Sequence, residues 1–239
     1  MPHTRFTIKE VAAYLHLTQD DIAALVKRNE IPFKIQGDRA MFSRSEIDGW
    51  ASQRILKLPE QRLTDYHSRS SSGLQDIGQS EPLMPCLFTT DRIAPCLTSR
   101  TKASTIQDLV RLAEKTNLVS DPRELLRMID ERENLCSTAL AGGWALLHPR
   151  YHDPYMFAES FIVLGRTIQS IHFGSVDGAP TDMFFLVCCQ DDRLHLHTLA
   201  RLCTMCMQTG LLGALRETES AESMLASLCV AEEDILRRL

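Results

Sequence analysis

Two short segments near the start of the chain carry apolar residues at helical spacing. Thr7 precedes the first segment and is followed three residues later by Glu10, which is the capping-box pattern that starts a helix. Thr18 is placed to cap the second segment, and the connection between the two is short. The apolar faces consist of Ile8, Val11, Ala12 and Leu15 in the first segment and Ile22, Leu25 and Val26 in the second. The pattern therefore predicts a helix-turn-helix.

A small hairpin is predicted behind these two helices. The runs Phe33-Lys34-Ile35 and Ala40-Met41-Phe42 lie on either side of a turn that contains Gly37. A further capped helix is predicted from Ser43 to Trp50. A hairpin that follows two helices indicates a small winged helix-turn-helix domain.

Two continuous apolar runs dominate the second half of the chain. The runs Phe161–Leu164 and Met183–Cys188 suit strands that are covered on both faces. Capping boxes that start at Ser104 and Asp121 predict two helices before these strands. A later helix is predicted to carry on one face Leu196, Leu199, Ala200, Cys203 and Met207. Helix and strand signals in this order predict a three-layer α/β/α sandwich with a mixed sheet.

A break separates the two predicted domains. The stretch from Thr64 to Pro85 is rich in Ser, Gln, Gly and Pro and has no sustained helical or strand periodicity. Such a composition is typical of a flexible linker. We therefore expect the helix-turn-helix domain at residues 1–56, a linker at 57–86 and the sandwich at 87–239.

Composition narrows the function classes. A net charge of −5 over 239 residues argues against nucleic-acid binding through the whole surface. The apolar runs are too short for a membrane span, and the start of the chain lacks the apolar core of a secretory signal, so we expect a cytoplasmic protein. The 8 cysteines lie mostly in apolar segments, which in a reducing compartment predicts buried thiols.

One histidine stands at the end of a predicted strand. The apolar run Trp144–Leu147 follows Gly142-Gly143 and leads directly into His148, so His148 is expected where a short buried strand meets the loops. Arg132 lies upstream. Because imidazole titrates near neutral pH, a useful fraction of such a histidine is neutral and nucleophilic.

Four separated motifs follow one another in the second half of the chain. They are Arg132-Glu133-x-Leu135-x-Ser137-Thr138, the strand that ends in His148, Asp177-Gly178-x-Pro180 before an apolar strand, and His195-Leu196-His197-Thr198-Leu199. In this order they resemble enzyme IIA of the bacterial phosphotransferase system, in its mannitol, fructose and nitrogen-regulatory class. The resemblance covers roughly residues 88 to 236.

The resemblance implies a role for each of these residues. His148 would accept a phosphoryl group from the phosphohistidine of the carrier HPr, and His195 would be the second active-site histidine. Arg132 suits the charge of a phosphoryl group, while Ser137 and Thr138 supply hydroxyl donors. No cofactor is implied.

Departures from the family pattern leave two functions open. Leu147 stands where the family usually has proline before the histidine, and the glycine-rich turn is altered at Cys136, Ala139, Ala141 and Gly142. The first function is a phosphoacceptor that reports sugar or nitrogen status to the tethered helix-turn-helix. The second is a transcription or interaction protein in which a degenerate enzyme IIA-like domain only senses or dimerises.

The N-terminal motifs resemble the excisionase-type branch of the MerR-like helix-turn-helix family. Its pattern is met at Glu10 to Leu15, at Ile31-Pro32 and at Asp48 to Trp50, and the resemblance covers roughly residues 6 to 51. It implies DNA as a partner.

Charge in this domain gives mixed evidence on DNA binding. Asp20 and Asp21 lie at the start of the second helix, where acids repel a phosphate backbone, although they also stabilise a helix start. We expect Gln19 as a base reader, with phosphate contacts from Arg28, Lys34, Arg39 and Arg44. A domain kept only for protein contacts is the alternative.

One rival constellation consists of zinc-ligand residue types. His195, His197, Cys203 and Cys206 have near-ligand spacings. On one helix, however, His195 and His197 point about 200° apart, and Cys203 continues the apolar face. We therefore expect no metal site here.

Overall fold

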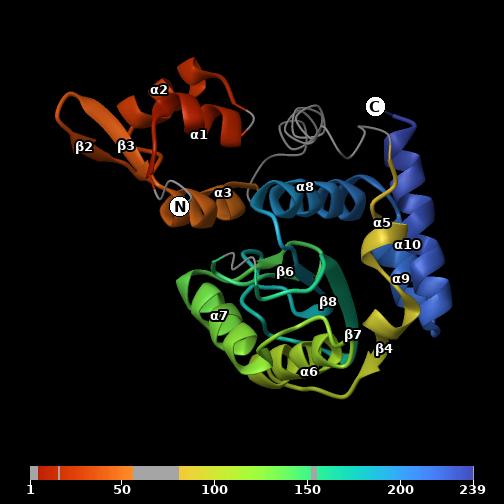
Figure 1. The fold of residues 1–239 in the computed structure, drawn as a ribbon. Helices are drawn as coiled ribbons and strands as arrows, with labels where there is room; N and C mark the ends of the chain where they lie inside the picture. Colours follow the sequence, from red (N-terminus) through yellow and green to blue (C-terminus); the bar gives the residue numbers. More distant parts are fainter. Residues whose placement is uncertain (1–4, 16, 56–80, 152–154, 239) are drawn as a thin grey trace.

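The computed structural model describes residues 5–15, 17–55, 81–151 and 155–238. Figure 1 shows a small N-terminal part, coloured red to orange, beside a larger sandwich of sheet and helices. Among the described residues, no helix combines the length and apolar character that crossing a membrane requires.

The N-terminal part contains the predicted helix-turn-helix. Thr7 caps the first helix and Thr18 the second. In each case the acid three positions later, Glu10 or Asp21, accepts a bond from the backbone of the capping residue, so both predicted caps are confirmed. The three helices are α1 (Ile8–Tyr14), α2 (Gln19–Lys27) and α3 (Arg44–Ile55).

A three-stranded antiparallel sheet completes this part. Its order is β1-β3-β2, with β1 at Arg5–Phe6, β2 at Lys34–Gln36 and β3 at Arg39–Ser43. Strands β2 and β3 form the predicted hairpin, and Gly37 in its turn has a φ of 62°, which favours glycine. Strand β1 was not predicted, because two residues are too few to show a periodicity. Phe42 is fully buried in one core with the apolar faces of α1 and α2. The sheet therefore packs against these helices, in the position predicted for the wing.

The larger part is built on a five-stranded mixed sheet. Its strands are β4 (Ile93–Leu97), β5 (Ala139–Leu140), β6 (Trp144–Leu147), β7 (Phe161–Ile171) and β8 (Thr181–Cys188), in the order β4-β7-β8-β6-β5. The β4–β7 and β6–β8 pairs are parallel, whereas β7–β8 and β5–β6 are antiparallel. The predicted strands at 144–147, 161–164 and 183–188 all lie in this sheet.

Helices cover both faces of the sheet, as predicted for a three-layer sandwich. In β8, Met183, Phe185 and Val187 face one core, and the alternate residues Phe184 and Leu186 face the other. The second face is covered by α6 (Lys102–Glu114) and α7 (Pro122–Leu135). The first is covered by α5 (Met84–Leu87), α8 (Asp192–Gln208), α9 (Leu211–Glu217) and α10 (Ala221–Leu236), as Figure 1 shows.

Three local predictions need correction or qualification. The cap of α6 is Thr101, and Ser104 is the third helical residue that bonds back to it. Met207 is 47% exposed and does not belong to the buried face of α8. Most of the predicted linker lies outside the described residues, but its end is folded, because α5 begins at Met84 and Leu83 is buried.

A buried ion pair anchors α8 to its neighbours. Arg201 Nη1 lies 2.7 Å from Glu232 Oε1, and both side chains are almost completely buried. The two Glu232 oxygens also accept bonds from the backbone N–H groups of Leu83 and Met84, each at 2.8 Å. Burial lowers the pKa of Arg201, while the Glu232 carboxylate acts in the opposite direction. On its other side, α8 lies against α3 of the N-terminal part.

Candidate active site

His148 directly follows strand β6 and is only 2% exposed. Side chains alternate along β6, with Trp144 and Leu146 facing the α8 side of the sheet. His148 continues this alternation and lies beside His195 of α8, with 5.1 Å between the ring centroids.

Two hydrogen bonds define the protonation of the His148 ring. Nδ1 lies 2.9 Å from the carbonyl oxygen of Leu146, which can only accept. Arg132 Nε, which can only donate, lies 3.0 Å from Nε2 of the same ring. The proton is therefore on Nδ1, and the lone pair on Nε2 points at the guanidinium.

Arg132 reaches the histidine from the last turn of α7, on the opposite face of the sheet. It is 1% exposed, and its Nη1 donates to the carbonyl oxygen of Cys136 at 3.0 Å. Its Nη2 has no hydrogen-bond partner among the residues that the structure describes. A buried guanidinium with a donor to spare beside a nucleophilic nitrogen is suited to an incoming anion.

His195 lies in the first turn of α8. Asp191 caps this helix by accepting a bond from Leu194 N at 3.0 Å. The N-terminal end of α8 therefore lies next to the two histidine rings. Its dipole favours negative charge at this place.

Glu133, next to Arg132 on α7, organises the loop that precedes β5. Its Oε1 accepts bonds from the backbone N–H of Thr138, at 3.0 Å, and from the Thr138 hydroxyl. Lys102 of α6 forms an ion pair with its Oε2 at 2.7 Å. The sequence reading did not single out Lys102, because a surface-type residue 31 positions from Glu133 carries no local signal.

The two predicted hydroxyl donors are both engaged by the protein in this structure. Thr138 donates to Glu133, and Ser137 Oγ donates to the carbonyl oxygen of Phe173 at 3.0 Å. Ser137 Oγ also accepts a bond from Ala139 N at 3.2 Å. Both hydroxyls therefore hold the loop between α7 and β5 in place.

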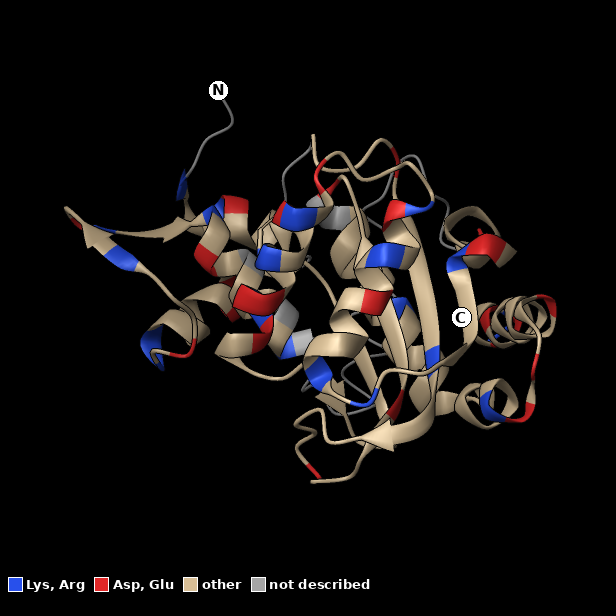
Figure 2. Ribbon diagram, turned by 90° about the horizontal axis from the view of Figure 1, so that it is seen from below, with Lys and Arg blue, Asp and Glu red and all other residues tan. Residues whose placement is uncertain are grey.

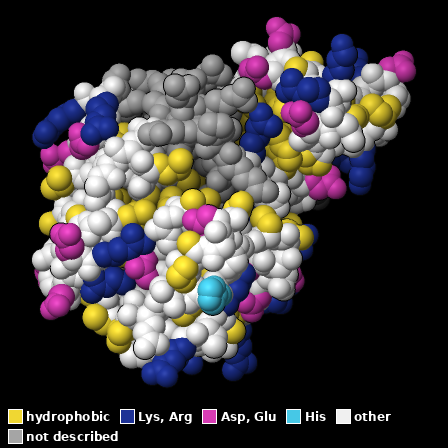
Figure 3. Space-filling view, turned by 180° about the vertical axis from the view of Figure 1, so that it is seen from behind, with side chains coloured by type: hydrophobic (Ala, Val, Ile, Leu, Met, Phe, Trp, Pro, Cys, Tyr) yellow, Lys and Arg dark blue, Asp and Glu magenta, His cyan; other side chains and the backbone are white. Residues whose placement is uncertain are grey.

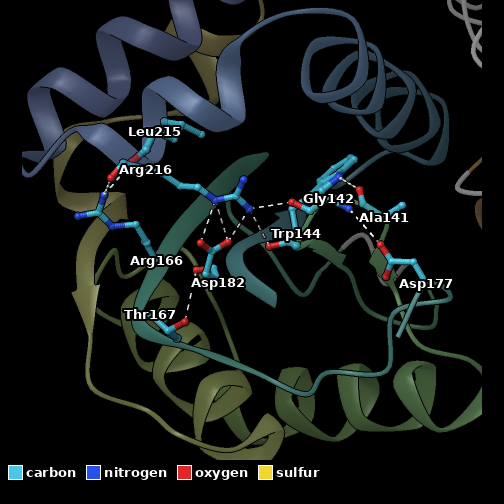
Figure 4. Close-up of polar contacts among 10 residues, drawn as sticks. Ala141, Gly142, Trp144, Arg166, Thr167, Asp177, Asp182, Leu215 and Arg216 are labelled. Carbon is cyan, nitrogen blue, oxygen red and sulfur yellow. Dashed lines mark hydrogen bonds and ion pairs between the residues drawn. The ribbon is translucent and has the colours of Figure 1, made fainter. Parts of the chain in front are cut away.

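The glycine turn between β5 and β6 is clamped from two sides, as Figure 4 shows. Arg216 of α9 donates to the carbonyl oxygen of Gly142 at 2.7 Å and pairs with Asp182 of β8 at 2.7 Å. Asp177 accepts a bond from Gly142 N at 3.4 Å. The bond from the Ser175 hydroxyl lowers the pKa of Asp177. The sequence reading assigned Asp177 to a motif but missed Arg216 and Asp182.

The predicted DNA contacts fall into two groups. On the helices, Arg28 pairs with Glu30 at 3.1 Å, and Arg44 lies 6.0 Å from the centroid of the Tyr14 ring. Gln19 is the exposed first residue of α2. Lys34 and Arg39 lie on the wing, where both are exposed.

The rival zinc set does not converge on one point. His195 faces His148, whereas His197 Nε2 lies 3.4 Å from Arg201 Nη2 in the buried pair described above. Burial raises the pKa of Cys203 and Cys206, which disfavours the thiolates that zinc requires. In the described parts of the chain, no group of three His, Cys, Asp or Glu side chains has metal-site geometry.

Family models match both parts of the chain. The model of the "Phosphoenolpyruvate-dependent sugar phosphotransferase system, EIIA 2" family matches residues 86–229, and a helix-turn-helix domain model matches residues 5–55. The chain belongs to the EIIA 2 family and carries a helix-turn-helix domain in addition. The resemblance to enzyme IIA is confirmed, and the N-terminal resemblance is confirmed at the level of a helix-turn-helix domain.

Two relatives show the range of proteins that contain this domain. The chain is 26% identical over 141 residues, 58% of its length, to the fructose-specific EIIABC component of Bacillus subtilis, of which it spans 22%. It is 26% identical over 147 residues, 60% of its length, to a nitrogen regulatory protein of Bradyrhizobium diazoefficiens, of which it spans 93%. The chain thus spans about a fifth of the first relative and almost all of the second.

Solved structures share the fold of the larger part. The nitrogen regulatory protein IIA-Ntr of Neisseria meningitidis superposes with a TM-score of 0.56 at 22% identity, over 62% of this chain and 99% of that one. The mannitol IIA of Escherichia coli gives 0.52 at 18% identity, over 59% of this chain and 98% of that one. These likenesses establish the enzyme IIA fold for the sandwich.

Proposed function

We propose that this chain is a regulatory phosphoacceptor of the phosphotransferase system. In this proposal His148 receives a phosphoryl group from the phosphohistidine of an HPr-like carrier in the cytoplasm. The phosphorylated sandwich, residues 87–239, then adjusts the helix-turn-helix domain, residues 1–56, to which a linker tethers it. The likeness to a nitrogen regulatory protein along nearly its whole length supports the regulatory role.

The observation that carries the proposal is the state of the His148 ring. A neutral imidazole whose Nδ1 proton is held by a backbone carbonyl presents a lone pair at Nε2. That lone pair is what an in-line attack on phosphorus requires. His148 therefore needs no general base.

In the proposed transfer, the phosphoryl group moves from a ring nitrogen of the donor histidine to Nε2 of His148. The Nε2 lone pair of His148 forms the new N–P bond while the N–P bond of the donor breaks, and its electron pair returns to the donor ring. His148 keeps its Nδ1 proton, so its ring gains positive charge as the bond forms. The carbonyl oxygen of Leu146, 2.9 Å from Nδ1, stabilises that charge.

Three surrounding groups stabilise the transferring phosphoryl group in this proposal. The Nε–H group of Arg132 exchanges its acceptor, His148 Nε2, for a phosphoryl oxygen. The buried Nη2 of Arg132 supplies a second hydrogen-bond donor. His195 and the N-terminal end of α8 lie on the other side of the ring. Ser137 and Thr138 contribute by holding the loop, and they reach the phosphoryl group only if they exchange their present partners.

One observation favours the alternative function of a domain that only senses or dimerises. His148 is 2% exposed, and its lone pair is occupied by Arg132. A donor must therefore open the site before it can reach Nε2. A domain in which this opening never occurs would retain the fold and bind partners without phosphorylation.

Incubation with enzyme I, HPr and labelled phosphoenolpyruvate separates the two functions. The proposal predicts stoichiometric label on the wild type, none on His148→Ala, and full label on the control His172→Ala, whose histidine is exposed and lies outside the site. An unlabelled wild type would establish the alternative.

We propose that the N-terminal domain binds DNA. Its exposed cations and the helix-turn-helix fold support this role. Contact between α3 and α8 gives phosphorylation a route to the domain, because His195 in the first turn of α8 lies beside His148. A selection from random duplexes at several salt concentrations tests binding, and the absence of any salt-dependent binding would leave protein contacts as the role of this domain.

A further inference from the structure

The wing sheet has one face turned away from the helices. Strand β3 places Phe42 on the helix side, so its neighbours Met41 and Ser43 lie on the outer face. Register then fixes the other strands, because Lys34 pairs with Met41 and Arg5 pairs with Ser43. Cross-strand partners share a face, so both cations lie on the outer face.

A third cation continues the same face toward the turn. Arg39 begins β3 and pairs with Gln36, and both are exposed. Arg5 pairs with Ser43, which lies four residues after Arg39 on β3. The distance along the strand between these two positions is about 13 Å. We define Arg39, Lys34 and Arg5 as the outer stripe, which runs diagonally across three strands.

Hydrogen-bond donors and a hollow accompany the outer stripe. Arg5 Nη1 donates to Gln36 Oε1 at 3.1 Å across the intervening strand, and the exposed Gln36 side chain has amide protons that can also donate. A hollow of about 370 Å³ is lined by Arg5, Lys34, Ile35, Gln36, Met41, Phe42 and Ser43. None of these lining residues is acidic.

The charge on this face is unopposed. Within the described part of the chain, neither Lys34 nor Arg39 forms an ion pair. Figure 2 shows blue segments on the hairpin. The acid of the hairpin, Asp38, lies in the turn between β2 and β3. On the face of the molecule that Figure 3 shows, side chains of both signs of charge are interspersed.

We infer that the outer stripe binds the phosphate backbone of duplex DNA, and that α2 does not enter a groove in that complex. Each DNA strand carries one charge per about 3.4 Å of helix axis, so a stripe of this length faces about four phosphates. Fixed strands hold the cations with little entropy to lose on binding. The hairpin points away from α8 and the sandwich in Figure 1, so these described parts of the chain do not cover the face.

The position of α2 distinguishes this inference from the usual use of a helix-turn-helix. Helices α1 and α2 pack on the Phe42 side of the sheet, so a duplex lying on the outer stripe does not meet the start of α2. That start carries Asp20 and Asp21, which repel phosphates. The inference rests on the proposed DNA binding and changes the surface that performs it.

Fluorescence anisotropy of the full-length protein with labelled duplex DNA tests the inference. Arg5→Gln/Lys34→Gln removes two stripe cations, and Lys27→Gln/Arg28→Gln removes the same charge from the end of α2. The stripe variant should bind at least about tenfold more weakly at 0.1 M salt, with a salt slope smaller by about two units. The α2 variant should change the affinity less than about threefold and keep the slope.

If the α2 variant loses DNA binding and the stripe variant keeps it, the inference is overturned. The proposal that the N-terminal domain binds DNA then still stands. A wild type that binds polyglutamate but no duplex overturns both and makes the stripe a surface for acidic proteins. Circular dichroism reports whether each variant folds.

Discussion

The Arg132 side chain connects two parts of the site. Its Nε meets His148 Nε2 at 3.0 Å, and its Nη1 meets the carbonyl oxygen of Cys136 at 3.0 Å. Lysine keeps the charge but cannot hold both partners, because its ammonium is a single point of donation. We expect Arg132→Lys to slow phosphoryl transfer from HPr about 100-fold, measured by rapid quench in a single turnover.

The control for this prediction lies on the same helix. Arg123 is exposed near the start of α7, so Arg123→Lys should transfer at the wild-type rate. If Arg132→Lys also transfers within threefold of the wild type, Arg132 has no part in the reaction.

Buried thiols make the free energy of unfolding fall as the pH rises into the alkaline range. Burial raises the pKa of the Cys189 thiol from its ordinary value of 9.0 to about 12. The unfolded chain releases this proton near pH 9 and the folded chain holds it, so the stabilising contribution is complete below pH 9 and is lost as pH rises toward 12. The free energy of unfolding should therefore fall by about 1.4 kcal/mol per pH unit for such a thiol.

Urea unfolding at pH 8, 9 and 10 measures this loss. Other groups titrate in the same range, so the informative quantity is the difference between the wild type and Cys189→Ala. The variant should lose stability less steeply above pH 9. Parallel pH profiles for the two proteins would show that Cys189 ionises normally in the fold.

At the scale of elements, Asp121 determines where α7 begins. Its side chain accepts bonds from Arg123 N and Glu124 N, each at 3.0 Å. Asp121→Ala should lower the free energy of unfolding by about 1 kcal/mol, whereas Asp121→Asn, which can still cap, should stay close to the wild type. Urea denaturation followed by circular dichroism compares them, and equal losses in both variants would exclude a capping role.

Helix starts show what a local pattern can and cannot determine. The Thr7 cap was predicted from Glu10 three residues later and the Thr18 cap from the apolar positions that follow it, and each residue caps its helix in the structure. Ser104 with Gln107 gave the same signal for α6, yet Thr101 caps it with Ser104 as the third residue. Thr101 with Ser104 and Ser104 with Gln107 are both possible helix starts in the sequence. Only the packing of the helix decides which of the two hydroxyls caps it.

The site was predictable to the extent that it lies in one segment of chain. The apolar run placed His148 at the end of a strand and the family spacing paired it with Arg132, and the structure brings Arg132 Nε to 3.0 Å from His148 Nε2. Lys102, Asp182 and Arg216 come from three other elements, and only the tertiary fold brings them to Glu133 and the Gly142 turn. The strand order β4-β7-β8-β6-β5 could not be predicted from the sequence either, because pairing between distant strands leaves no periodic pattern in it.

At the scale of the whole molecule, α8 connects the two domains. Its first turn lies at His148, its middle carries Arg201 in the buried pair with Glu232, and α3 lies against it. Phosphorylation adds about two negative charges near its first turn. We expect amide exchange in α3 and α8 to change on phosphorylation by HPr, measured by hydrogen–deuterium exchange.

His148→Ala under the same conditions is the control. It should show no change in α3, because it cannot take up the phosphoryl group. An unchanged exchange pattern in the phosphorylated wild type would mean that the sandwich does not signal through α3.

In the proposed transfer, Nε2 of His148 is the phosphoryl acceptor. The direct measurement is the phosphorus–nitrogen coupling in the NMR spectrum of 15N-histidine-labelled protein after incubation with enzyme I, HPr and phosphoenolpyruvate. We predict one phosphohistidine, with phosphorus coupled to Nε2 of His148 and with Nδ1 still protonated against the Leu146 carbonyl. Coupling to Nδ1, coupling to another histidine, or no phosphohistidine at all would contradict the claim.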